Sequence, residues 1–332
     1  MSDNRRIAVI GSNSFSGSDF IDFLLEDPIN EVIGISRSPE KSFLFLPYKR
    51  RKNPRFWFYR LNLNKRMKEI IKALDSFKPD WVVNFAAQSE VAPSWEWPGH
   101  WFQTNAVALS ELVAGLQRGS YLKRYLHIST PEVYGSCAGQ VREGHSLDPS
   151  TPYAASKAAA DLLLSAYHKS RAFPVVEVRS ANVYGAHQQL WKIIPRTVVY
   201  LKLGKKIPLH GGGKSMRSFI HIRDVSRGEL AALERGRTGA VYHLSTDKVY
   251  SIADIVRTIC KLMNRNFDTA TESASARSGH DKAYVLNSSS AKVELGWTAS
   301  VELEDGIRKV IEWVEENWKV IRRQPLEYSH RR

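Results

Sequence analysis

A glycine turn near the N-terminus is the feature that most constrains the fold of this chain. A buried-strand pattern over residues 6–10 runs into Gly11-Ser-Asn-Ser-Phe-Ser-Gly17, and a helical period begins at Ser16. Glycine lets the backbone approach a pyrophosphate, and the N-terminus of the following helix offers unpaired N–H groups to the anion. Ser14 stands where a middle glycine is often found. The position of the turn between a strand and a helix nevertheless predicts a dinucleotide-binding site.

Strand and helix patterns alternate over the first half of the chain. Strands are expected at 6–10, 31–36, 55–60, 81–85, 124–129 and 174–179, and helices at 16–26, 64–77, 101–116 and 152–170. The alternation predicts an α/β fold with a Rossmann-type doubly wound parallel sheet.

The pattern changes after about residue 184, where longer irregular stretches separate helices expected near 191–203, 251–263 and 303–318. We expect a mainly dinucleotide-binding domain at 1–183, a smaller C-terminal substrate-binding cap at 184–321 and a polar tail at 322–332. The cap is expected to be interleaved with the first domain.

Composition narrows the class of protein. The chain has 332 residues, of which 43% are hydrophobic, enough for a sizeable core. No apolar run approaches the ~18 residues that a membrane span needs, and no signal-peptide pattern precedes the first strand. The two cysteines, Cys137 and Cys260, have neither metal-site nor disulfide-framework spacing. These features predict a cytoplasmic protein without a metal site.

The charge balance is strongly basic, with 48 Lys and Arg against 34 Asp and Glu, a net charge of +14. Such a charge attracts anionic partners. The densest basic cluster, residues 49–52, is interpreted as a solvated loop, with a phosphate- or nucleic-acid-binding patch as the alternative. Because no nucleic-acid-binding motif accompanies it, nucleic acid is an unlikely partner.

A tyrosine and a lysine lie four residues apart in Tyr153-Ala-Ala-Ser-Lys157, within the helix expected at 152–170. Residues at this spacing share one face of a helix. Lowering the pKa of a tyrosine from ~10 to ~7 takes roughly 4 kcal/mol. One cation at ~4 Å supplies roughly that much at an effective dielectric constant of about 20. The pair therefore predicts a site where a phenol moves a proton while a nicotinamide moves a hydride.

The end of the second strand bears on the choice of cofactor. An acidic residue there would accept hydrogen bonds from the ribose 2′-hydroxyl of NAD, but the sequence reads Ser36-Arg37. A serine and an arginine suit a 2′-phosphate. The sequence therefore slightly favours NADP, with NAD and an exposed Arg37 as the alternative.

Further motifs follow in order along the chain. They are Asn84-Phe-Ala-Ala-Gln88, Ser129-Thr-Pro-Glu-Val-Tyr-Gly135, Asn182-Val-Tyr-Gly185, Lys192-Ile-Ile-Pro195, Arg217-Ser-Phe-Ile-His-Ile-Arg-Asp224, Gly279-His-Asp281 and Glu294-Leu-Gly-Trp297. With the glycine turn and the Tyr–Lys pair, this set resembles the extended short-chain dehydrogenases/reductases, and most closely the nucleotide-sugar 4,6-dehydratases of the NAD-dependent epimerase/dehydratase family. The resemblance covers nearly the whole chain. It implies a homodimeric enzyme that makes a 4-keto-6-deoxy sugar from a nucleotide diphosphate sugar and recycles a tightly bound cofactor.

The resemblance also assigns site residues. The implied catalytic residues are Thr130, Tyr153 and Lys157 for hydride transfer, and Glu132 as the base that removes the C5 proton. The implied cofactor-binding residues are Gly11, Ser14, Phe15, Ser16, Gly17, Ser36, Arg37, Asn62, Leu63, Phe85, Ala86, Ala87, Gln88, Asn105, Ser129 and Lys157. The implied substrate-binding residues are Gln88, Ser89, Glu132, Tyr153, Asn182, Lys192, Arg217 and Arg277.

One position departs from the pattern. The dTDP-glucose enzymes have an aspartate before the glutamate, which looks like the acid for the departing hydroxyl, whereas this chain has Pro131. Other relatives, including the GDP-mannose dehydratases, have serine or threonine there. An epimerase, a 4-ketoreductase or a decarboxylase of the same family is the alternative function. A non-catalytic dinucleotide- or RNA-binding protein is a remote alternative.

Overall fold

A seven-stranded parallel sheet forms the centre of the computed structural model, which describes residues 4–50, 52–137, 139–275 and 285–330. Its strand order is β12-β7-β5-β4-β1-β2-β3. The strands are β1 (Arg5–Ile10), β2 (Asn30–Ser36), β3 (Phe56–Arg60), β4 (Trp81–Asn84), β5 (Arg124–Ile128), β7 (Val175–Ser180) and β12 (Val241–Leu244). All neighbouring strands run parallel, so the predicted doubly wound α/β fold is confirmed.

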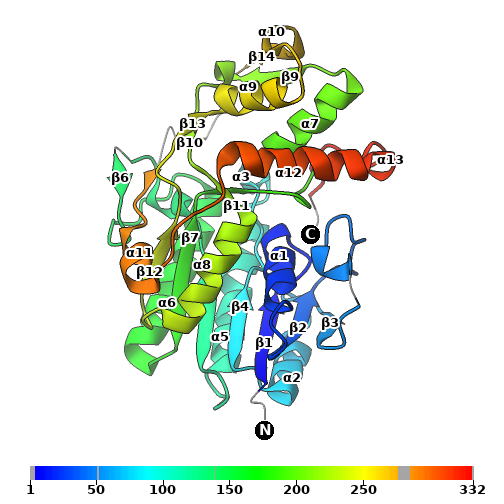
Figure 1. The fold of residues 1–332 in the computed structure, drawn as a ribbon. Coiled ribbons are helices and arrows are strands. Elements are labelled where there is room, and N and C mark those ends of the chain that lie inside the picture. Colours follow the sequence, from blue (N-terminus) through cyan, green and yellow to red (C-terminus); the bar gives the residue numbers. More distant parts are fainter. Residues whose placement is uncertain (1–3, 51, 138, 276–284, 331–332) are drawn as a thin grey trace.

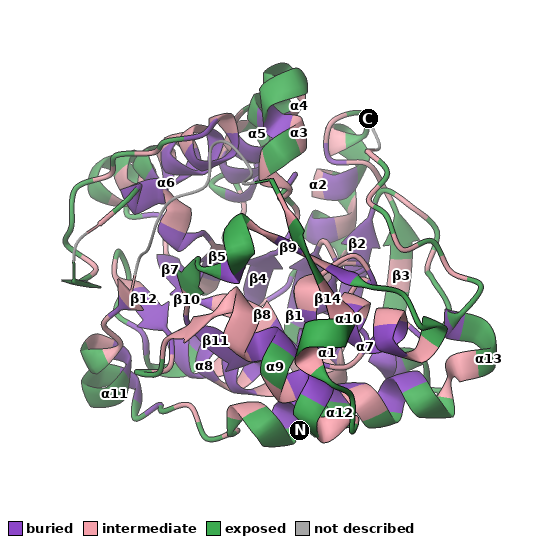
Figure 2. Cartoon of the chain, turned by 90° about the horizontal axis from the view of Figure 1, so that it is seen from above, coloured by how far each residue is buried: buried purple, intermediate pink, exposed green. Residues whose placement is uncertain are grey.

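Successive side chains of β1 enter different cores, which explains why helices cover both faces of the sheet. Ile7 and Val9 lie in the core that includes side chains of α1 (Phe15–Leu24), α8 (Ile222–Arg235) and α11 (Ser289–Leu295). Ala8 and Ile10 lie in the core that includes side chains of α2 (Met67–Phe77), α5 (Ala108–Leu116) and α6 (Pro152–Arg171). Figure 2 shows the buried strands between these two helical layers.

The strand order reverses at β1, which has β2 on one side and β4 on the other. In a sheet of this kind, the crevice for a ligand lies at such a switch point, beyond the carboxyl ends of the strands. The glycine turn follows β1, and the segments 85–88 and 129–132 follow β4 and β5. The topology therefore brings three of the predicted motifs to one edge of the sheet.

The smaller part of the molecule lies above this edge (Figure 1). It contains α7 (Ile193–Leu203), α9 (Ile252–Leu262), α10 (Phe267–Ala270), α12 (Leu303–Glu316) and α13 (Trp318–Ile321), and α7, α9 and α12 share a core of their own. Short strand pairs complete it: β8 (Asn182–Tyr184) with β11 (Phe219–His221), β9 (Ile207–His210) with β14 (Thr271–Ala274), β10 (Met216–Arg217) with β13 (Tyr250–Ser251), and β6 (Gln140–Val141) with β15 (Val285–Leu286).

The later half of the chain also supplies β12 to the central sheet, beside β7. This strand was not expected from the sequence, because Val-Tyr-His-Leu is short and carries a polar residue in a buried place. The exact boundary at residue 183 stays a prediction. Among the described residues, we find no helix with the length and apolar character required for a transmembrane span.

The helix expected at 101–116 is interrupted. It consists of α4 (Pro98–Phe102), a π-helical turn at Gln103–Val107 and α5, and a short α3 (Val91–Glu96) precedes it. Such π-turns are often found at functional sites, and this one carries Asn105.

Candidate active site

The glycine turn forms a cradle made of backbone. Gly11 has a φ of +88°, and a Cβ atom placed on it would lie 2.6 Å from the Ala86 backbone nitrogen. A Cβ on Gly17 would lie 2.6 Å from the Gly11 carbonyl oxygen. Ser14 accepts a hydrogen bond from the Gly17 N–H at 3.0 Å and so caps α1, which explains a serine in place of a middle glycine. The side-chain-free turn at a helix N-terminus fits the pyrophosphate of a dinucleotide.

Gly11→Ala is expected to lower both thermal stability and dinucleotide affinity, because the new Cβ meets backbone atoms after β4. Gly204→Ala is the matched control: Gly204 also has positive φ (+66°), but nothing lies within 4 Å of the added Cβ. The control should lose only about 1–2 kcal/mol of folding free energy from the left-handed backbone. Thermal unfolding with and without NAD measures both effects. Equal losses of stability in the two variants, with unchanged NAD affinity, would contradict the cradle.

Asn105 connects the segment after β4 to the Tyr–Lys helix. Its Oδ1 accepts from the Gln88 N–H at 2.9 Å, and its Nδ2 donates to the Gln88 carbonyl at 3.0 Å and to Ser156 Oγ at 2.9 Å. Asn105 is buried. The structure therefore places this predicted cofactor residue as a brace behind the segment 85–88, in which Ala87 is exposed and Ala86 half-buried.

The end of β2 is bonded to the glycine turn, whereas the segment after β3 has a local hydrogen bond of its own. Ser36 Oγ accepts from the Asn13 N–H at 3.0 Å, so this hydroxyl holds the turn in place. Arg37 is exposed beside it. Asn62 Oδ1 accepts from the Asn64 N–H at 2.9 Å, and Leu63 is buried. Ser36 thus has a structural use that the sequence analysis did not foresee.

The segment after β5 is shaped by a short helical turn, η3 (Pro131–Tyr134). Thr130 is its N-cap, and Thr130 Oγ1 accepts from the Glu132 N–H at 3.3 Å. Thr130 is buried and Glu132 is half-buried. Pro131 occupies the first position of the turn, where a missing N–H has no cost. This local geometry accounts for proline at the position where some relatives have an acid.

The α6 helix carries the Tyr–Lys pair. Thr151 caps it by accepting from the Ala154 N–H at 3.1 Å, and the Tyr153 N–H donates to Ser94 Oγ at 3.2 Å. Lys157 Nζ donates to the Ile128 carbonyl at 2.8 Å, at the end of β5. This bond holds the helix beside the strand that leads to Thr130. Burial lowers the pKa of Lys157 to about 8.

Four titratable or charged residues that the sequence patterns did not point to lie behind Lys157. They are His127, Asp161, Glu177 and Arg179, and all four are buried. Asp161 could have been found, because it continues the four-residue spacing of Tyr153 and Lys157 along α6. His127 carried no signal beyond an imidazole in a buried strand.

The predicted substrate residues approach from the cap. Lys192 Nζ pairs with Glu90 Oε1 at 2.8 Å. Asn182 Nδ2 donates to the Ser218 carbonyl at 3.2 Å, and Arg217 Nη1 donates to the Met216 carbonyl at 2.7 Å. Ser89 is exposed beside Glu90, and Gln88 is buried. Arg277 lies outside the described residues. None of these contacts joins one predicted substrate residue to another, although Lys192 pairs with Glu90, the neighbour of Ser89.

The polar tail crosses from the cap to α4. The Tyr328 ring packs edge-on against Trp191, with centroids 5.7 Å apart. The His330 ring stacks on Trp101 at 5.1 Å and lies in hydrogen-bond contact with His100, with 3.0 Å between Nε2 and Nδ1. The tail is therefore packed next to Trp191, whose indole N–H donates to Glu90 at 3.1 Å.

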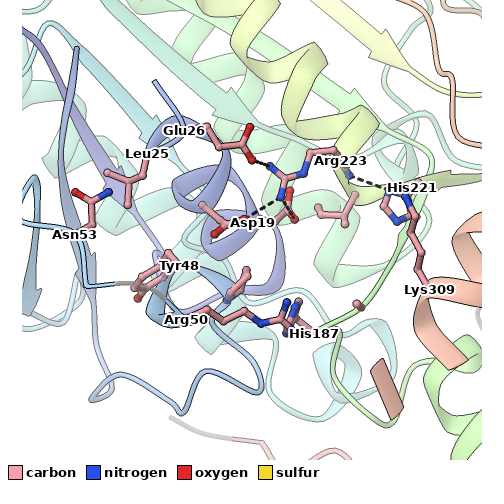
Figure 3. Close-up of a pocket in the computed structure, with 14 residues that line it drawn as sticks. Asp19, Leu25, Glu26, Tyr48, Arg50, Asn53, His187, His221, Arg223 and Lys309 are labelled. Carbon is pink, nitrogen blue, oxygen red and sulfur yellow. Dashed lines mark hydrogen bonds and ion pairs between the residues drawn. The ribbon is translucent and has the colours of Figure 1, made fainter. Parts of the chain in front are cut away.

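A separate cavity of about 380 Å³ lies beside α1 and α8 (Figure 3). Arg223 crosses it and pairs with Asp22 at 2.9 Å, Glu26 at 3.1 Å and Asp19 at 3.6 Å. Its lining includes no described residue of the predicted site. The ion pairs connect α8 to α1, so this cavity belongs to the packing of the two helices.

A backbone cradle facing a Tyr–Lys helix defines an extended short-chain dehydrogenase/reductase. A profile of the GDP-mannose 4,6 dehydratase family matches residues 9–310. The chain belongs to this family of nucleotide-sugar dehydratases. It is 33% identical to a dTDP-glucose 4,6-dehydratase of Actinoplanes sp., over 94% of this chain and 98% of the relative.

Solved structures agree with this assignment. DesIV, a dTDP-glucose 4,6-dehydratase from Streptomyces venezuelae solved with NAD bound, matches with a TM-score of 0.88 and 30% identity, over 95% of this chain and 98% of that chain. A UDP-glucuronic acid 4-epimerase from Bacillus cereus, solved with UDP-glucuronic acid and NAD, matches with a TM-score of 0.86 and 27% identity, over 94% and 99%. Because both structures contain NAD, the predicted preference for NADP gains no support from them.

Proposed function

We propose that this chain is an NAD-dependent nucleotide-sugar 4,6-dehydratase. The observation that carries the proposal is the arrangement at the carboxyl edge of the sheet. Thr130 and Glu132 follow β5, and Lys157 on the Tyr–Lys helix is hydrogen-bonded to the last residue of that strand. The family membership and the nearly complete coverage of dehydratase relatives support the same reaction.

The residues divide the chemistry between them. Tyr153 takes the proton of the sugar C4 hydroxyl, with its phenolate stabilised by the Lys157 ammonium. Thr130 hydrogen-bonds the same oxygen and aligns it. NAD, when bound in the cradle, supplies a nicotinamide that accepts the C4 hydride and later returns it to C6.

The ketone at C4 makes the C5 proton acidic, and Glu132 removes it. Elimination then breaks the bond from C6 to its hydroxyl, which leaves as water once it receives a proton. Pro131 has no proton to give. We assign this step to Glu132, which has just gained the C5 proton, and C5 then takes its final proton from solvent.

Incubation with a panel of sugar nucleotides tests the proposal. dTDP-glucose, UDP-glucose and GDP-mannose cover the bases named for the family and its relatives. NMR and mass spectrometry of the product should show a 4-keto-6-deoxy sugar. A C4-inverted sugar would assign the chain to epimerases, and released CO₂ to decarboxylases.

An epimerase is the second candidate, because the UDP-glucuronic acid 4-epimerase shares the fold closely. Inversion at C4 needs no base at C5. The carboxylate of Glu132, two residues beyond Thr130, therefore favours dehydration.

The cofactor proposal can be tested at the end of β2. Arg37→Asp should weaken NADP binding far more than NAD binding if Arg37 contacts a 2′-phosphate, because a carboxylate repels that group. We expect the native protein to prefer NAD, because the related structures of DesIV and of the UDP-glucuronic acid 4-epimerase contain NAD. Dissociation constants for both dinucleotides in both proteins measure the effect. Tighter binding of NADP than NAD by the native protein would contradict the expectation.

The homodimer and the cytoplasmic location stay predictions. Leu162 on α6 and Val107 in the π-turn are 63% and 45% exposed. These exposed apolar side chains could pack against helices of a second copy of the chain. Light scattering of the purified protein, which measures its mass, tests whether a dimer forms.

A further inference from the structure

The ammonium group of Lys157 is held from behind by two acceptors on β5. Lys157 Nζ lies 2.8 Å from the Ile128 carbonyl oxygen and 3.0 Å from His127 Nε2. An ammonium has three N–H donors, so two of them point at β5 and one is left for a group in front. Because Lys157 donates, His127 Nε2 accepts and the ring is assigned as neutral, with its proton on Nδ1. Burial, together with Lys157 and Arg179, lowers the pKa of His127 well below its usual value, in keeping with this assignment.

Asp161 lies near the same ring nitrogen of His127 that contacts Lys157, one helical turn beyond Lys157 on α6. Its Oδ2 accepts from Ser129 Oγ at 2.7 Å and from Arg179 Nη2 at 2.8 Å, and its Oδ1 lies 3.8 Å from His127 Nε2. The carboxylate therefore connects the residue before Thr130 to the charged groups around Lys157. Its negative charge acts on a lysine that is 2% exposed, where water screens the interaction poorly.

We propose that His127 and Asp161 are positioning residues for the Tyr153–Lys157 pair. His127 fixes the direction of the Lys157 ammonium, and Asp161 keeps that ammonium charged within a buried site. Neither residue touches the substrate in this assignment. The inference deepens the proposed function and rests on it only in taking Tyr153 as the base whose phenolate Lys157 stabilises.

The charges around Lys157 determine the expected pH dependence. The titratable or charged groups around it and its network are Tyr153 and Asp161 on α6, His127 on β5, Glu177 and Arg179 on β7, Tyr134 on η3, His243 on β12, and Glu143. Burial lowers the pKa of Lys157 to about 8, whereas Asp161 and Glu177 raise it and Arg179 lowers it. Loss of the Asp161 charge therefore lowers the pKa of Lys157 further. A neutral amine does not stabilise a phenolate, so the pKa of Tyr153 should rise and the alkaline limb of the rate profile should move to lower pH.

Glu177 provides a matched control for Asp161. It is as deeply buried and lies 3.6 Å from Arg179, between Glu177 Oε2 and Arg179 Nη2. Burial, then the Asp161 charge, raises the pKa of Glu177 to about 8. Because the pKa of Glu177 is raised, Glu177→Gln removes a buried carboxyl beside Arg179 while taking away only part of a negative charge at neutral pH. The control separates loss of a charge from loss of a buried carboxyl.

The test uses the NAD-loaded protein. Ultraviolet difference titration against Tyr153→Phe reports the ionisation of Tyr153 without any substrate, and the pH profile of turnover is the second readout. Asp161→Asn should raise the Tyr153 midpoint by roughly one pH unit, the lower range for loss of a charge partner, and His127→Leu should shift the midpoint in the same direction. Turnover at neutral pH should fall roughly tenfold, the equivalent of one unit. His127→Gln keeps an acceptor near the position of Nε2 and should keep the native midpoint, and Glu177→Gln should move the midpoint less than Asp161→Asn does.

The outcomes decide between the alternatives. Asp161→Asn leaves Arg179 without its buried partner and can fail to fold, whereas the His127 variants keep the Asp161–Arg179 pair and carry the test in that case. An unchanged Tyr153 midpoint in a folded His127→Leu that binds NAD normally would overturn the inference. A shift of the Tyr153 midpoint in His127→Gln as large as that in His127→Leu would also overturn the inference. If the native protein turns over none of the sugar nucleotides, the proposed function is rejected instead. The titration of Tyr153 would still decide whether His127 and Asp161 position the Tyr153–Lys157 pair.

Discussion

Tyr153→Phe is expected to lose turnover by at least about 100-fold, the lower range for removal of a general base. The phenol is buried on the same face of α6 as Lys157, which donates to the end of β5. Without the hydroxyl, no group takes the C4 proton as the sugar is oxidised. Because the ring remains, binding of NAD and of the nucleotide sugar should be unchanged. Product formation followed by NMR and cofactor content after denaturation measure the two properties.

Tyr167→Phe is the matched control for this variant. Tyr167 lies on the same helix, and its ring packs against Phe173, with centroids 6.2 Å apart. Tyr167→Phe also removes a phenol hydroxyl, but one that lies away from the segment after β5. Turnover should therefore stay at the native level. Native turnover in Tyr153→Phe, or an equal loss in both variants, would remove Tyr153 from the mechanism.

Glu132→Gln is expected to retain cofactor binding and to lose dehydration by about 100-fold or more, because an amide cannot accept the C5 proton. The C5 position of the sugar should record the change, because in the proposed mechanism C5 takes its final proton from solvent. In D₂O, the native protein should exchange the C5 proton of the sugar for deuterium, and the variant should not. Mass spectrometry of the recovered sugar nucleotide measures the exchange.

Glu143→Gln serves as the comparison for that experiment. Glu143 accepts from the His243 N–H at 3.3 Å and from Ser290 Oγ at 3.1 Å, so its carboxylate contacts β12 and the first turn of α11. It should exchange the C5 proton normally. Unchanged exchange in Glu132→Gln would assign the C5 base to another residue and reopen the question that Pro131 poses.

Much of the site was readable from the order of the motifs. Gly11, Thr130 and Tyr153 each stand at a junction that the sequence marks, after a buried strand or at the start of a capped helix. Parallel strands bring their carboxyl ends to one edge, so the alternation of strands and helices was enough to predict that these segments meet. Two details were predicted less well. The Ser36 hydroxyl serves the glycine turn, and the Asn105 amide braces the segment after β4. Both bonds join residues at least 17 positions apart, which local patterns do not report.

The sequence by itself determined the class of fold and predicted which groups react, because periodicity, caps and the spacing of Tyr153 and Lys157 are local properties of the chain. The tertiary structure decided what surrounds those groups. It brought β12 back beside β7, placed the tail against Trp101, and set His127 and Asp161 behind Lys157. The physical reason is that the charge and direction of a buried ammonium depend on neighbours contributed by separate strands and helices. Those neighbours meet only when the sheet is complete.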